Sequence, residues 1–123
     1  IGIDRCRSSY VFKSILDSGG VVVFGSDWPV VTINPFVGIE AAVTGKIMDG
    51  RFWMTQENIT VAEALRCYTS RGAYAMFMEN EIGKIAPGYR AEFIILNESP
   101  FGPAPKWSGI RPEMVYVEGR KVR

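Results

Sequence analysis

The chain has 123 residues, enough for one domain with a modest hydrophobic core. Its content of 47% hydrophobic and 22% charged residues is ordinary for a globular protein. A net charge of +1 gives no overall field, and no apolar run is long enough to span a bilayer, so we expect neither nucleic acid nor a membrane as a partner.

The first third of the chain predicts a helix followed by a buried strand. Residues 8–18 have the periodicity of a helix that Ser8 or Ser9 could cap, and a two-glycine turn ends it. Residues 21–24 are apolar without polar alternation. This pattern predicts a strand buried on both faces, as in a parallel sheet covered by helices.

Two further helices are predicted in the middle of the chain. Asn34 followed by Pro35 is a typical helix start, and the helix should cover residues 36–47. The connection after it should tuck Phe52 and Trp53 into the core. The second helix begins at a capping box, and its apolar stripe comprises Val61, Ala64, Leu65 and Tyr68.

The capping box has Thr60 as the cap and Glu63 three residues later. A further helical stretch covers 73–78, and Gly72 marks either a break before it or a close packing contact. Its aromatic residues, like Phe52 and Trp53, are expected in the core.

The character of the sequence changes near residue 80. Residues 93–96 predict a strand, and a loop rich in proline and glycine follows. Residues 114–117 and 120–122 predict a closing hairpin around a two-residue turn. We therefore expect α/β structure before this point and β structure after it.

The chain has two cysteines and no histidine. Cys6 and Cys67 form no CxxC pair, and nothing indicates a secreted disulfide framework, so we expect reduced thiols and a cytoplasmic protein. The lack of histidine removes the commonest general base and the commonest metal ligand. Together with a start at Ile1 in place of Met, it leads us to expect a piece of a longer protein.

Asp27 is the main candidate for chemistry, because it follows the predicted strand in the stretch FGSDWPV. Ligands bind where the strands of parallel α/β folds end, so an acid there can be catalytic. Aspartate is also a common turn residue, and taken alone the turn is the simpler interpretation. Trp28 can line a pocket or pack. Ser26 has no histidine in the chain to activate it, which excludes a serine triad within the chain.

Three segments resemble, in order and spacing, the C-terminal end of a metal-dependent amidohydrolase: FGSDWPV, TVAEALRCYTSRGAYAMF and EIGKIAPGYRAEFIIL. The branch they resemble most is the amidohydrolase-3 or YtcJ-like group, which includes formamide-deformylase-like enzymes and a plant light-signalling relative. The resemblance implies an α/β fold, the C-terminal fragment of a TIM (β/α)8 barrel followed by the C-terminal share of a small β-sandwich. Residues 1–80 would be the last helix–strand–helix units of the barrel, and 81–123 the sandwich strands.

The resemblance also implies a site. The family's acid after the eighth strand, here Asp27, helps to hold a divalent metal, zinc, and moves a proton from the metal-bound water to the leaving nitrogen. The full-length protein would use a metal-bound hydroxide to hydrolyse a non-peptide C–N bond in a small-molecule amide or N-formyl substrate. Trp28 is the candidate substrate contact. One acid cannot hold a catalytic zinc, so we expect the chain alone to be inactive and to bind no metal tightly.

The sequence departs from the family and leaves rivals open. The family's HxH pair and later histidines are absent, and Tyr89-Arg90-Ala91-Glu92 stands where relatives commonly have Lys-x-Ala-Asp. One alternative is a non-catalytic interaction or regulatory module that keeps the fold. Another is a barrel relative that acts without metal, with Asp27 as its base. An extended strand with unpaired edges also favours self-association as a homo-oligomer.

Overall fold

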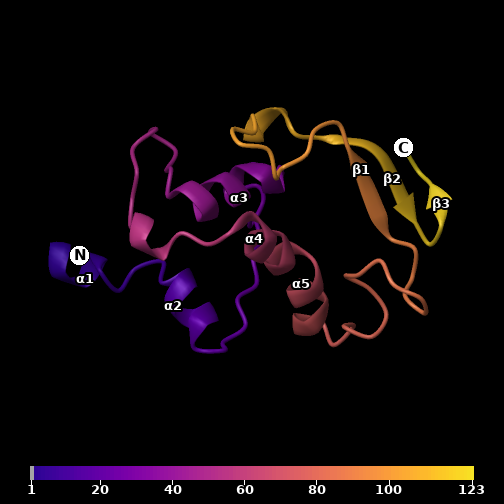
Figure 1. The fold of residues 1–123 in the computed structure, drawn as a ribbon, viewed down its shortest axis with the longest axis horizontal. Helices are drawn as coiled ribbons and strands as arrows, with labels where there is room; N and C mark the ends of the chain where they lie inside the picture. Colours follow the sequence, from indigo (N-terminus) through magenta and orange to yellow (C-terminus); the bar gives the residue numbers. More distant parts are fainter. Residues whose placement is uncertain (1) are drawn as a thin grey trace.

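The computed structural model describes residues 2–123, the side chain of Ile3 excepted, as a helical part joined to a small sheet (Figure 1). The α-helices are α1 (Ile3–Cys6), α2 (Phe12–Asp17), α3 (Pro35–Thr44), α4 (Val61–Tyr68) and α5 (Ser70–Ala75). The two 3-10 helices are η1 (Thr55–Glu57) and η2 (Trp107–Gly109), and the strands are β1 (Phe93–Leu96), β2 (Pro112–Val117) and β3 (Arg120–Lys121). None of the helices in this part of the chain is long and apolar enough to cross a membrane.

Helix α2 is shorter than predicted. Its N-cap is Val11, which offers no side-chain hydrogen bond, so the prediction of Ser8 or Ser9 as the cap is wrong. The preceding residue, Tyr10, has a left-handed φ of 55°, which interrupts any helix that starts earlier. The predicted two-glycine stop is confirmed, because Gly19 follows the helix with φ of 84°.

The predicted strand at residues 21–24 is extended chain without a strand partner among the described residues. Its expected burial on both faces is wrong. Val22 and Phe24 pack against the core, whereas Val21 and Val23 are 51% and 42% exposed. The physical reason is that none of the strands among residues 2–123 pairs with this segment, so none covers its outer face. The segment is held by a hydrogen bond from Phe24 N–H to the Cys67 carbonyl at 3.1 Å.

Helix α3 starts as predicted and ends early. The Asn34 side chain accepts a hydrogen bond from Phe36 N–H at 3.0 Å, and Pro35 takes the first helical position. Gly45, with φ of 74°, ends the helix before the predicted residue 47. Phe52 in the following connection is 64% exposed, so the expectation that this connection tucks its aromatics into the core is wrong.

The capping box of α4 is confirmed. The Thr60 hydroxyl accepts from Glu63 N–H at 3.2 Å, and the Glu63 carboxylate accepts from Thr60 N–H at 2.8 Å. The break before α5 falls at Thr69, with φ of −122° and ψ of −95°, and not at Gly72. Gly72 also has open space around its Cα, so the alternative of a close packing contact is wrong as well.

The sheet is antiparallel, in the order β1-β2-β3. Phe93 lies opposite Tyr116, and their rings stack at 4.6 Å with 14° between the planes. The hairpin between β2 and β3 is confirmed, because Glu118 and Gly119 occupy its turn with φ of 50° and 76°. Positive φ at both turn residues matches the right-handed twist of the strands.

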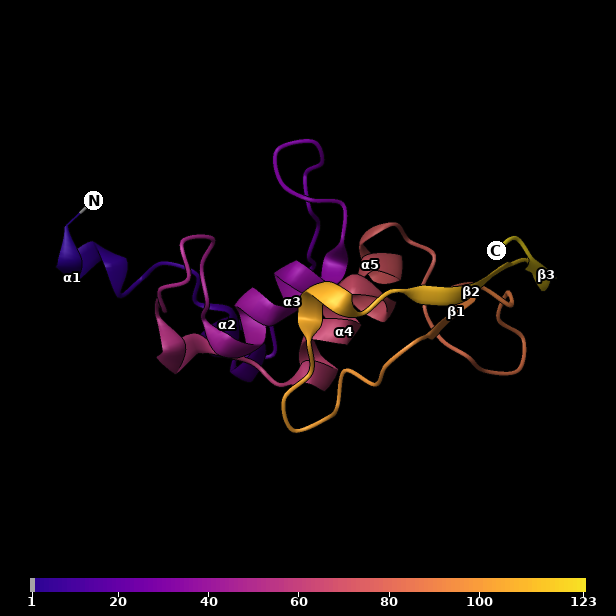
Figure 2. The same cartoon turned by 90° about the horizontal axis from the view of Figure 1, so that it is seen from above.

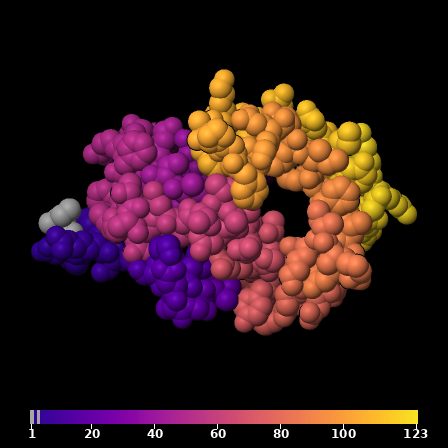
Figure 3. Space-filling model, in the orientation of Figure 1, coloured from indigo at the N-terminus to yellow at the C-terminus, as the bar shows by residue number. Residues whose placement is uncertain are grey.

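The main core joins the helices to the C-terminal segment. Helices α3 and α4 pack together, and η2 folds back onto α3. The buried cluster comprises Phe36, Ile39, Ala42, Ile59, Ala64, Cys67, Trp107 and Ile110. The sheet reaches away from this core, and an opening separates it from the end of the helical part (Figure 3). The division of the chain into two domains at residue 80 stays a prediction, although the strands β1, β2 and β3 all come after that residue.

Candidate functional site

Asp27 lies on a loop between the extended segment and α3 that projects from the body of the molecule (Figure 2). Its φ is 48°, and its carbonyl accepts a hydrogen bond from Val30 N–H at 2.9 Å, so the residue does form a turn. The Trp28–Pro29 peptide bond within this turn is cis. Within residues 2–123 the Asp27 carboxylate has no recorded hydrogen bond or ion pair, and the residue is exposed.

Trp28 lies beside Asp27 and is 65% exposed. Both side chains are therefore open to solvent. Neither of them lines the groove that runs beside α3. The sequence placed these two candidates on one loop, and the structure keeps them together there. Their catalytic and substrate-binding roles stay predictions.

The donor set of this chain does not fit a metal ion by itself. No group of three or more His, Cys, Asp or Glu side chains in the described part of the chain is arranged to hold one. A catalytic zinc takes three protein ligands, and Asp27 supplies a single carboxylate. The described residues therefore do not by themselves bring together the ligands of a catalytic zinc.

A second feature is a groove of about 860 Å³ between α3 and the connection that follows it. Three of the rings that line it form an edge-to-face series: Phe12 and Phe24 have centroids 5.0 Å apart, and Phe24 and Tyr68 have centroids 5.6 Å apart. Glu40 and Glu57 also line it. Sequence reasoning missed this groove, because its walls come from five stretches that are separate in the sequence.

Electrostatics in the groove follow from local contacts. Burial raises the pKa of the Tyr68 phenol, and the nearby Cys67 adds to this, so the phenol stays neutral and keeps its proton as a donor. Hydrogen bonds from Ser14 lower the pKa of Glu57. Hydrogen bonds from Arg51 lower the pKa of Asp49 in the same way. The two carboxylates therefore carry charge at neutral pH.

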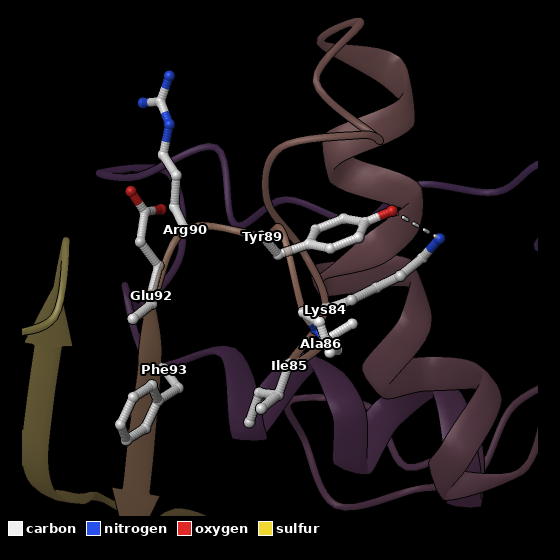
Figure 4. Close-up of a pocket in the computed structure, with 9 residues that line it drawn as sticks. Lys84, Ile85, Ala86, Tyr89, Arg90, Glu92 and Phe93 are labelled. Atoms are coloured by element: carbon white, nitrogen blue, oxygen red, sulfur yellow. Dashed lines mark hydrogen bonds between the residues drawn. The ribbon is translucent and has the colours of Figure 1, made fainter.

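A smaller pocket of about 290 Å³ lies between the loop after α5 and the start of β1 (Figure 4). The Lys84 ammonium lies 5.4 Å from the centre of the Tyr89 ring and 3.4 Å from its hydroxyl, which in turn donates to the Glu79 carbonyl at 2.9 Å. Arg90 pairs with the carboxylate of Glu81. The YRAE stretch that departs from the family pattern thus supplies local contacts that order this loop.

The described residues form an α/β unit in which helices and a small antiparallel sheet adjoin one core, with an unpaired acid on the loop after an extended apolar segment. The chain belongs to the amidohydrolase family, whose Amidohydro_3 model matches residues 1–123. This confirms the resemblance of the three motif segments to the amidohydrolase-3 branch.

Curated relatives agree with this family. The chain is 32% identical over 126 residues to Protein LONG AFTER FAR-RED 3 of Arabidopsis thaliana, covering 99% of the chain and 21% of the relative. It is 33% identical to the putative amidohydrolase YtcJ of Bacillus subtilis, covering 85% of the chain and 20% of the relative. It is 36% identical to the N-substituted formamide deformylase of Arthrobacter pascens, covering 72% of the chain and 16% of the relative. The chain spans about a fifth of the length of these relatives.

Solved structures share the fold. An amidohydrolase from Thermotoga maritima superposes with a TM-score of 0.70 at 20% identity, covering 93% of this chain and 26% of that one. An uncharacterised metal-dependent hydrolase from Pyrococcus furiosus superposes with a TM-score of 0.61 at 30% identity, covering 74% of this chain and 18% of that one. In both, a unit like this one is a minor part of a much longer chain.

Proposed function

We propose that this chain is the C-terminal part of a metal-dependent hydrolase with a (β/α)8 barrel. Residues 1–80 would complete the barrel, and residues 81–123 would be its share of a composite β-sandwich. Two observations support this. The relatives are about five times as long as the chain. The extended segment 21–25 also has an exposed outer face and no strand partner in the described residues, as a barrel strand separated from its neighbours would.

The proposed reaction is hydrolysis of a non-peptide C–N bond in a small amide or N-formyl compound. The name of the Arthrobacter relative supports the N-formyl class, and the Pyrococcus structure supports a metal. The metal, zinc in this proposal, would lower the pKa of a bound water molecule to roughly 7. Most of its ligands would lie outside this chain, with Asp27 adding one oxygen.

Asp27 is the residue of this chain that would move the proton. A single observation carries this role: its carboxylate is exposed and unpaired within the described residues, directly beyond the extended segment. An amine leaves poorly unless it is protonated, so a carboxylate near both reacting atoms must accept a proton from water and return it to nitrogen. Trp28, next to it and exposed, would contact the substrate.

The test is Asp27→Asn in the full-length protein. Asparagine keeps the shape and the turn but cannot carry the proton, so kcat should fall by at least about 10²-fold while KM changes much less. Metal content must be measured on the same sample. The control is Asp17→Asn, at an exposed acid that pairs with Lys13 on α2, which should leave kcat unchanged. A folded, metal-loaded Asp27→Asn protein with normal kcat would remove Asp27 from the mechanism.

A second candidate function is a non-catalytic interaction or regulatory module. The observation that favours it is the Arabidopsis relative, which matches 99% of the chain and has a name without an enzyme activity. The upstream sequence of the full-length protein separates the two proposals. A protein without the HxH pair and the later histidines, and without hydrolysis of N-formyl substrates, would support the module.

A further inference from the structure

The loop that carries Asp27 depends on its two ends for its place in the molecule. Its residues, 25–33, project from the body (Figure 2). The hydrogen bonds recorded for this loop in the described chain are local: Val30 N–H donates to the Asp27 carbonyl at 2.9 Å, and Asn34 N–H donates to the threonine hydroxyl two residues earlier at 3.2 Å. The position of the Asp27 carboxylate is therefore set where the loop joins the extended segment at Phe24 and α3 at Asn34.

Helix α4 holds the first of these ends. Phe24 N–H donates to the Cys67 carbonyl at 3.1 Å, which lies in the last turn of the helix, where carbonyls have no partner within the helix. The Phe24 ring also lies edge-to-face with the Tyr68 ring, with 5.6 Å between the centroids. The C-terminal turn of α4 thus contacts the extended segment through a backbone bond and through a ring, three residues before Asp27.

The same tyrosine reaches the second end of the loop. Gly38 lies in α3, four residues after Asn34, and a Cβ atom there would come within 2.3 Å of the Tyr68 hydroxyl oxygen. Glycine inside a helix is ordinarily less stable than alanine, and the close approach of this hydroxyl is a physical reason for a glycine here. Tyr68 therefore touches the structure on both sides of the loop.

We propose that Tyr68 is a positioning residue for Asp27. Its ring lies against the extended segment and its hydroxyl against α3, so it sets the distance between the two ends of the loop and thereby the place of the carboxylate. This inference rests on the proposed function, in which that carboxylate carries a proton from water to nitrogen. Proton transfer needs hydrogen-bond distances, and a displacement of about 1 Å can reduce a rate about 10²-fold.

The test compares Tyr68→Leu with the wild type in the full-length protein. Leucine is apolar but too short to keep both contacts, so kcat should fall by about 10- to 10²-fold while KM changes much less. In an Asp27→Asn background the same change should cause no further fall, because Tyr68 acts only through that carboxylate. The matched control is Thr60→Ala, which weakens α4 at its opposite end and should leave kcat of the folded protein unchanged.

A second readout does not depend on activity. Hydrogen exchange followed by mass spectrometry should be faster in peptides covering residues 25–33 of the Tyr68→Leu protein, and unchanged in peptides covering residues 112–117 of the sheet. Wild-type exchange in the loop would overturn the positioning role, whatever the kcat. Normal kcat in Asp27→Asn would overturn the proposed function, and the exchange result would then still decide whether Tyr68 holds the loop.

A pair of variants covers the case in which Tyr68→Leu does not fold. Gly38→Ala places a methyl group against the Tyr68 hydroxyl, so it should lower kcat and leave KM nearly unchanged. Tyr68→Phe removes the hydroxyl and keeps the ring, so the double variant should recover most of the wild-type kcat. An unchanged kcat in Gly38→Ala, or a loss that Tyr68→Phe does not reverse, would contradict the role of Tyr68 as the contact between the two ends.

Discussion

Ser14 and Glu57, 43 residues apart in the sequence, are joined by two hydrogen bonds. Ser14 N–H donates to Glu57 Oε2 at 2.9 Å, and the Ser14 hydroxyl donates to Oε1 at 2.7 Å. Val11, the residue at the N-cap of α2, has no side-chain bond of its own. Glu57 therefore caps α2 from a distance, and its negative charge suits the positive end of the helix.

The first prediction is that Glu57→Gln lowers stability in a pH-dependent way. The bonds from Ser14 lower the pKa of Glu57 below its ordinary value of 4.5, so the folded state favours the charged form. The stabilisation is therefore complete above about pH 4.5 and disappears as the pH falls through the lowered pKa. Urea midpoints of the two proteins should differ at pH 7 and converge at low pH.

The control for this measurement is Glu98→Gln, at an exposed glutamate without a recorded hydrogen bond in the described chain. It should give a pH-independent difference close to zero. A constant gap between wild type and Glu57→Gln from pH 7 to pH 3 would contradict the capping role of the charged carboxylate.

Short sequence motifs correctly predicted the helix caps and the turn, because hydrogen bonds between near neighbours in the chain determine these features. The capping box at Thr60, the Asn34 cap and the two-residue hairpin turn at Glu118 and Gly119 all formed as expected, because their partners lie within three residues. Helix α2 was misplaced because its cap comes from Glu57, and no local pattern encodes a partner that far away.

Burial was predicted less well than secondary structure. Phe52 and Phe77 were expected in the core and are 64% and 92% exposed, whereas Trp107, placed in a loop, is buried. Apolar composition shows that a side chain needs a partner, but it does not show whether that partner lies in this chain. The proposed site on Asp27 came from family resemblance, since an aspartate in a turn has no distinctive pattern of its own.

The second prediction concerns the capping box. Thr60→Ala should destabilise the fold by about 1 kcal/mol, because the N–H of Glu63 loses its acceptor. Thr60→Ser keeps the hydroxyl and should restore most of this loss. Urea unfolding of the three proteins measures the effect. An alanine variant with the wild-type midpoint would show that water replaces the cap at no cost.

The third prediction tests whether the C-terminal segment belongs to the main core. Trp107 is 8% exposed and packs in the cluster with α3 and α4, so Trp107→Ala should cost about 3 kcal/mol or more. Phe101→Ala, at an aromatic residue of the same loop that is 64% exposed, should cost little. Equal losses in the two variants would mean that the loop does not anchor the sheet to the helices.

The fourth prediction is that the 123-residue chain retains no zinc after exhaustive dialysis. No group of three potential ligands is assembled among residues 2–123, and one carboxylate binds zinc weakly. Elemental analysis provides the measurement, and the full-length protein treated in the same way provides the comparison. Near-stoichiometric zinc on the short chain would show that it assembles ligands that the structure does not bring together.

The last prediction concerns Gly38 in α3, which lies against Tyr68 in α4. A Cβ atom at Gly38 would come within 2.3 Å of the Tyr68 hydroxyl oxygen and 3.4 Å of the ring carbon that bears it. Glycine within a helix is ordinarily less stable than alanine by about 0.5–1 kcal/mol. At this position the collision should cancel that gain, so Gly38→Ala alone should be neutral or destabilising.

Removing the hydroxyl should reverse the sign. In a Tyr68→Phe background the nearest ring carbon is at an ordinary contact distance, so Gly38→Ala should stabilise the protein by about 0.5–1 kcal/mol. Residues in direct contact typically couple by about 0.5–3 kcal/mol, which a four-protein cycle of urea midpoints resolves. Equal effects of Gly38→Ala in the two backgrounds would place the Tyr68 hydroxyl away from α3. A coupling of the expected sign would establish the contact between these two helices beside the groove that Tyr68 and Gly38 both line.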